Sequence, residues 1–100
     1  MSVLDNDFGY RVITTERLKN LGFIFQENLI MRVDEIICTS YIYRIPRHKY
    51  LNQYHEFNYI PELNELRIKL NVTPWRIEKE YKIKPSCIED IIIEINRHCN

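Results

Sequence analysis

Residues 64–83 read NELRIKLNVTPWRIEKEYKI, and this stretch decides the fold because apolar and polar side chains alternate along it on both sides of Pro74. The apolar positions are Leu66, Ile68, Leu70, Trp75, Ile77, Tyr81 and Ile83. A period of two places successive side chains on opposite faces of a strand. The stretch therefore predicts two strands, each with one apolar face and one charged face, and these strands need an apolar cover.

The cover is predicted at the end of the chain. Isoleucines recur at helical spacing after Pro85, and the expected stripe consists of Ile88, Ile91, Ile92, Ile95 and Cys99. Ser86 and Glu89 match a capping box, in which each side chain bonds a free backbone N–H of the first turn. We expect a helix over residues 86–98 with its isoleucines on the sheet, and with Glu94 and Arg97 facing water.

A second, shorter helix is predicted over residues 14–21. Thr14 can cap its first turn, and Gly22 stands where a left-handed residue commonly ends a helix, followed by the apolar Phe23. Further strands are expected within residues 23–33, over 36–45 and over 56–60, and the polar, aperiodic residues 46–55 predict a loop.

Together these elements predict an α+β fold: a small, mainly antiparallel sheet of four to five strands, with a short N-terminal helix and a C-terminal helix packed on one face. One hundred residues suit one domain, residues 1–100, in which residues 1–10 form a loosely ordered arm. Three cysteines without a Cys-x-x-Cys spacing, no signal peptide and no long apolar run predict a cytoplasmic protein away from membranes.

The segment Arg44–Tyr54 combines cations with aromatic rings. Phosphates attract such cations and bases stack on such rings, so the segment is a candidate nucleic-acid site. Its members, with the neighbouring tyrosines, are Tyr41, Tyr43, Arg44, Arg47, His48, Lys49, Tyr50 and Tyr54. The alternative is a strand end that runs into a solvated loop, and a formal net charge of zero does not favour a nucleic-acid binder.

Aromatic residues are also numerous for a small core. Tyrosine is enriched in protein interfaces, so this surplus can indicate contact with a protein partner or with a second copy of the chain. Tyr59 and Trp75 join the tyrosines named above in that surplus. The alternative is that these rings fill the core.

The sequence carries no catalytic or metal-binding signature. The chain has two glycines, no phosphate-binding loop and no nucleophile elbow, and its histidines and cysteines lack ligand spacing. We therefore expect no catalytic residue, no metal site and no cofactor.

Two segments carry a family resemblance. The first segment is residues 13–23, ITTERLKNLGF, and the second is the predicted strand and helix that contain Tyr81-Lys82-Ile83 and Ile88-Glu89-Asp90-Ile91. Both resemble segments of small uncharacterised proteins of Bacteroidetes bacteriophages and prophages. The resemblance implies a phage-encoded protein. With the missing catalytic motifs, it leads us to expect a non-enzymatic interaction module, such as an inhibitor of a host or bacterial defence protein, with a nucleic-acid-binding regulator as the alternative.

Overall fold

A computed structural model describes residues 12–26, 31–33 and 35–99, so the predicted arm at residues 1–10 lies outside the described residues. Five strands form an antiparallel sheet in the order β1-β4-β5-β6-β7. They are β1 (Ile24–Phe25), β4 (Tyr41–His48), β5 (Gln53–Ile60), β6 (Glu65–Val72) and β7 (Lys79–Ile83). A separate hairpin joins β2 (Met31–Val33) to β3 (Ile36–Cys38).

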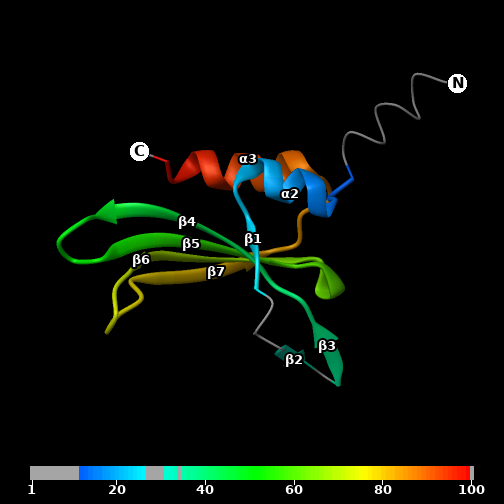
Figure 1. Ribbon diagram of the computed structural model, residues 1–100, viewed down its shortest axis with the longest axis horizontal. Coiled ribbons are helices and arrows are strands. Elements are labelled where there is room, and N and C mark those ends of the chain that lie inside the picture. The colour runs from blue at the N-terminus through cyan, green and yellow to red at the C-terminus, as the bar shows by residue number, and fades with distance from the viewer. Residues whose placement is uncertain (1–11, 27–30, 34, 100) are drawn as a thin grey trace, which may run out of the picture.

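Both described α-helices, α2 (Thr15–Leu21) and α3 (Ile88–Arg97), lie on one side of the sheet, and the β2–β3 hairpin projects on the other side (Figure 1). The predicted small α+β fold is confirmed. No helix in the described parts of the chain has the length and apolar character needed to cross a bilayer.

The alternation of residues 64–83 produces β6 and β7, which pair in register from Leu66 with Ile83 to Leu70 with Lys79. Leu66 and Ile68 are fully buried. The second strand begins only at Lys79, however, so the prediction of a strand from Trp75 onward is wrong. Backbone hydrogen bonds between Thr73 and Arg76 close a turn instead, which leaves Trp75 outside the sheet.

Two further boundaries differ from the prediction. Residues 36–45 are split between β3 and β4, which belong to different sheets. Between them, the N–H and hydroxyl of Thr39 both donate to the carboxylate of Glu62. The expected loop at residues 46–55 shrinks to residues 49–52, since β4 continues through Pro46. Beyond Ile42 the outer edge of β4 has no strand partner among the described residues, and an edge tolerates proline.

Helix α2 begins and ends as predicted. The Thr14 hydroxyl accepts a hydrogen bond from the N–H of Arg17, and Gly22 adopts φ 108°. A Cβ at Gly22 would lie 2.8 Å from Cε1 of Tyr43, so the close approach to this ring also requires glycine. Phe23 follows the cap and is buried.

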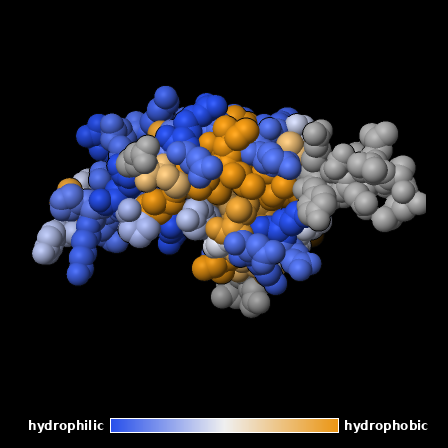
Figure 2. Space-filling view, turned by 90° about the horizontal axis from the view of Figure 1, so that it is seen from above, coloured by the Kyte–Doolittle hydropathy of each residue, from blue (hydrophilic) through white to orange (hydrophobic). Residues whose placement is uncertain are grey.

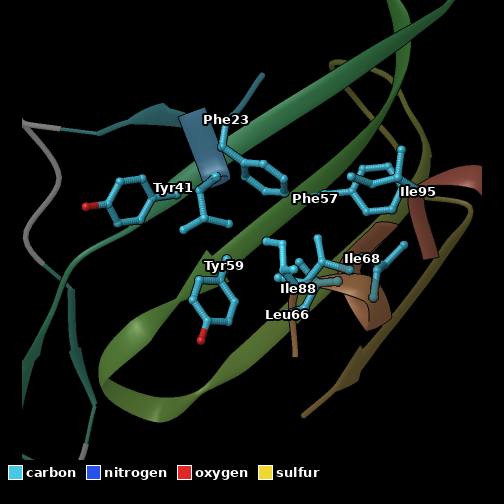
Figure 3. Packing of buried hydrophobic residues seen from close by; sticks show 10 residues of the cluster. Phe23, Tyr41, Phe57, Tyr59, Leu66, Ile68, Ile88 and Ile95 are labelled. Carbon is cyan, nitrogen blue, oxygen red and sulfur yellow. The ribbon is translucent and has the colours of Figure 1, made fainter. Parts of the chain in front are cut away.

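The isoleucine stripe of α3 covers the sheet as predicted. Ile88, Ile91 and Ile95 are buried, and Figure 3 shows Ile88 and Ile95 beside core residues of the strands, Leu66, Ile68 and Phe57. Cys99, in contrast, is exposed. Seen from the helix side, hydrophobic residues gather over the middle of the molecule and hydrophilic residues border them (Figure 2).

Two details of α3 differ from the prediction. The capping box does not form: Cys87 is the N-cap, and the N–H and hydroxyl of Ser86 both donate to Oδ2 of Asp90. The hydrogen bonds from Ser86 hold the pKa of Asp90 below its ordinary value. Glu94 is buried instead of facing water, because the Tyr81 hydroxyl donates a hydrogen bond to its carboxylate.

Candidate interaction surface

Three of the predicted tyrosines lie in the core. Tyr41 and Tyr59 are buried, and Tyr43 is half-buried with its ring 5.6 Å from that of Phe23. The Tyr59 hydroxyl donates to Oδ1 of Asn64, and burial raises the pKa of Tyr59. These rings stabilise the fold and offer little surface to a partner.

Arg44 and Tyr54 lie on the sheet face opposite the helices, which we call the open face. The Arg44 guanidinium stacks over the Tyr54 ring at 4.8 Å and its Nε donates to Oε1 of Glu56 at 3.0 Å. The second oxygen of Glu56 lies 3.7 Å from Nζ of Lys69. Arg44 and Tyr54 are thus engaged within the protein, in a face whose charges compensate one another.

A second carboxylate repeats this arrangement. Glu65 accepts a hydrogen bond from Nε of Arg67 at 2.7 Å and lies 3.3 Å from Nζ of Lys82. The hydrogen bond from Arg67 is the main cause that lowers the pKa of Glu65, against the opposing effect of burial. Each buried glutamate of the open face therefore has two cationic neighbours.

The remaining predicted residues lie at one end of the sheet, where two turns stand side by side. The β4–β5 turn and the β6–β7 turn are neighbours because Tyr54 pairs with Val72 across β5 and β6. They lie together at the left of Figure 1. We call residues 48–52 and 73–77 the hairpin-tip surface.

Apolar side chains of the hairpin-tip surface are exposed to an unusual degree. Tyr50 is 91% exposed and Trp75 is 78% exposed, and Leu51 and Ile77 are also exposed. A hollow of about 220 Å³ between the turns is lined by residues of both, including Leu51 and Trp75. Large apolar groups gathered at one site on a surface commonly mark a binding site.

The residues of the hairpin-tip surface carry a net positive charge, and the Glu78 side chain also lines its hollow. Its ten residues, HKYLN and TPWRI, include Lys49 and Arg76 and no carboxylate. Both turns are fixed by local hydrogen bonds: the N–H of Leu51 donates to Nδ1 of His48, and Thr73 pairs with Arg76. A partner therefore meets a preformed surface that combines aromatic rings with two cations.

Beneath this surface, His55 supports the β6–β7 turn. Its Nδ1 accepts a hydrogen bond from the N–H of Asn71, and the Asn71 amide donates to Oε2 of Glu78. Desolvation by burial, followed by the charges of Arg47 and His98, lowers the pKa of His55. The neutral imidazole is the form that this hydrogen bond requires.

Tyr81, Glu94 and His98 form a neighbouring polar cluster. The Tyr81 hydroxyl donates to Glu94 at 2.7 Å and lies 2.7 Å from Nε2 of His98. Burial, and then the Glu94 carboxylate, raise the pKa of Tyr81 to about 12, so its hydroxyl serves as a hydrogen-bond donor and not as a base. Across the described ranges, no three His, Cys, Asp or Glu side chains are placed to hold a metal ion.

Comparison with protein-family models, with curated proteins and with solved structures finds no match to this chain.

Three residues of this surface, His48, Lys49 and Tyr50, were predicted from the sequence as candidate site residues. Trp75 was expected in a strand. Their neighbours Leu51, Arg76 and Ile77 were not predicted to belong to the site. The available signal was Pro74, which precedes Trp75 and favours a turn. The short connection Pro61-Glu62-Leu63 between two strands does indicate a β5–β6 hairpin, and the register confirms it. No pattern shows that the turns at the far ends of these strands then stand side by side.

Proposed function

We propose that the protein is a non-enzymatic protein-interaction module that binds its partner through the hairpin-tip surface. The observation that carries the proposal is the exposure of Trp75 and Tyr50 on adjacent turns. Tryptophan, tyrosine and arginine are the residues that most often dominate binding energy at protein interfaces, and Arg76 adds the third type. The aliphatic neighbours Leu51 and Ile77 extend the apolar area, as the centre of a protein interface requires.

The partner that fits this surface is a protein with an acidic rim around an apolar pocket. Lys49 and Arg76 complement carboxylates, and charge complementarity of this kind speeds encounter and selects the partner. An inhibitor of a host or bacterial defence protein is one such module. That role, and a phage origin, follow from the resemblance at residues 13–23 and 81–91 and stay predictions.

The test compares the wild-type chain with the double variant Tyr50→Ala/Trp75→Ala. Tagged chains are used to capture proteins from lysate of the source cells, and the retained proteins are identified by mass spectrometry and then purified for titration. We expect the dissociation constant of the partner to rise at least ~30-fold in the double variant, which corresponds to one hot spot of about 2 kcal/mol. Ile93→Ala, at an exposed position of α3, is the matched control and should bind as the wild type does.

Equal binding by the double variant and the wild type contradicts the proposal. The folded state of each variant is checked by circular dichroism and by its urea midpoint, because both substituted side chains are exposed and should contribute little to stability.

The cations of the same surface favour one second candidate, binding of single-stranded nucleic acid, in which Trp75 and Tyr50 stack on bases. Anisotropy of a labelled oligonucleotide at about 50 and 200 mM salt separates the two candidates, since phosphate contacts weaken as salt rises. Salt-dependent binding that is lost in Lys49→Ala/Arg76→Ala would establish the second candidate. Absence of such binding supports the first.

A further inference from the structure

The charges of the open face form a row across the sheet that stops at its edge. The strand register places Arg44 opposite Glu56, Glu56 opposite Lys69, and Lys69 opposite Glu80. The signs therefore alternate across four strands, from positive on β4 to negative on β7. Directly opposed charges of unlike sign stabilise neighbouring strands, so the next position beyond Glu80 favours a cation.

Strand β7 is an edge of this sheet, because β6 is its strand partner within the described chain. Its pairing with β6 is regular over five residue pairs, without a bulge, and the strand contains no proline. The opposite edge is less regular. Strand β1 has only two residues, and Pro46 in β4 lacks a backbone N–H that could donate a hydrogen bond. A regular edge of this kind presents unpaired N–H and C=O groups to a further strand.

The sequence of β7, Lys-Glu-Tyr-Lys-Ile, supplies the missing cation itself. If two copies of β7 pair antiparallel about Tyr81, Glu80 of one copy stands opposite Lys82 of the other, and the reverse pair follows by symmetry. Glu80 and Lys82 both lie on the open face, on the opposite side of β7 from Tyr81, whose hydroxyl contacts α3. Glu80, at the end of the charge row, would then face Lys82 of the second copy.

The charges at this edge are available for such a contact. Glu80 and Lys82 are exposed residues, and with Arg67 they line an open hollow of about 400 Å³. Within the described residues Glu80 has no ion pair, and Lys82 contacts Glu65 with most of its side chain still exposed. Lysine on an edge strand commonly opposes unwanted pairing. In β7, however, Glu80 lies near Lys82, so the register centred on Tyr81 places opposite charges beside each other and is favourable.

We propose that β7 is a self-association edge at which two copies of this chain join through antiparallel β7 strands, with two Glu80–Lys82 ion pairs across the symmetry axis. The two sheets become continuous, and both α3 helices lie on the same side of the joined sheet. The hairpin-tip surfaces remain free at opposite ends, because the paired strands run antiparallel. This dimer is independent of the proposed function.

Charge exchange at the edge tests the proposal. Sedimentation equilibrium of the wild-type chain, over about 1–500 μM at low salt, should show a monomer–dimer equilibrium. Glu80→Lys converts two attractive contacts into two repulsive ones, so we expect its dissociation constant to rise at least ~10-fold. Glu80→Lys/Lys82→Glu restores opposite charges across the axis and should recover most of the affinity.

Glu16→Lys, which makes the same charge change at an exposed position of α2, is the control and should dimerise as the wild type does. Circular dichroism checks that each variant is folded. A wild-type chain that is monomeric at the highest concentration overturns the proposal. So does a dimer whose affinity Glu80→Lys leaves unchanged, or one that the double exchange fails to restore.

Discussion

Replacement of Ile91 by alanine measures how much the isoleucine stripe of α3 contributes to the fold. Ile91 is fully buried in the core cluster. The substitution removes three carbon atoms, worth about 0.8 kcal/mol each in transfer free energy, and leaves a cavity between helix and sheet. We expect the free energy of unfolding to fall by about 2.5–4 kcal/mol.

Ile93→Ala is the matched control on the same helix. Ile93 is 53% exposed, so it loses about half of the transfer term and creates no cavity. Alanine also has the higher helix propensity, by a few tenths of a kcal/mol, and this gain is the same at both positions. The expected cost at Ile93 is therefore about 0.5–1 kcal/mol.

Urea unfolding, followed by circular dichroism, gives both values. The slope of the unfolding free energy against urea should be the same in the two variants, since the same surface is exposed on unfolding. Equal losses of unfolding free energy in Ile91→Ala and Ile93→Ala would refute this packing of α3. They would mean that Ile91 is no more buried against the sheet than Ile93.

Three further predictions each concern a single residue. The pKa of His55 is lowered in the folded protein, so the unfolded chain binds a proton more readily. The contribution of His55 to the free energy of unfolding should be fully present above the ordinary pKa of 6.5 and should be lost as the pH falls through the lowered pKa. His55→Gln should reduce this pH dependence, measured by urea titrations at several pH values. Tyr81→Phe removes the hydrogen bond to buried Glu94 and should cost about 1–3 kcal/mol, whereas Tyr50→Phe, at an exposed position, should cost nothing measurable. Gly22→Ala should lower the unfolding free energy by about 1–3 kcal/mol, since alanine is strained at φ 108° and its Cβ meets the Tyr43 ring; unchanged thermal stability would contradict the cap geometry.

Local patterns predicted the framework of the fold. The alternation around Ile68 indicates which strand residues face the core, and the spacing of Ile88, Ile91 and Ile95 does the same for the helix. Each pattern therefore predicts its own element without information on the element that packs against it. Thr14 and Gly22 likewise act within one turn of the chain, and both caps formed as expected.

Long-range contacts decided the rest. Glu94 lies toward the polar side of α3 by spacing, and only the Tyr81 hydroxyl from β7 makes its burial favourable. Trp75 is in phase with the apolar positions Tyr81 and Ile83 of β7, and only the bridge between Thr73 and Arg76 removes it from the sheet. The short Pro61-Glu62-Leu63 connection indicates that β5 and β6 pair, but no pattern in the sequence shows that the turn with Tyr50 and the turn with Trp75 then stand side by side.

Trp75 is the single tryptophan of the chain, so its fluorescence reports on the hairpin-tip surface alone. The most direct measurement is acrylamide quenching of this emission in the free chain and in complex with the captured partner. We predict an indole that is freely quenched in the unbound chain and shielded, with blue-shifted emission, in the complex. Shielded emission in the unbound chain, or quenching that the partner leaves unchanged, would contradict it.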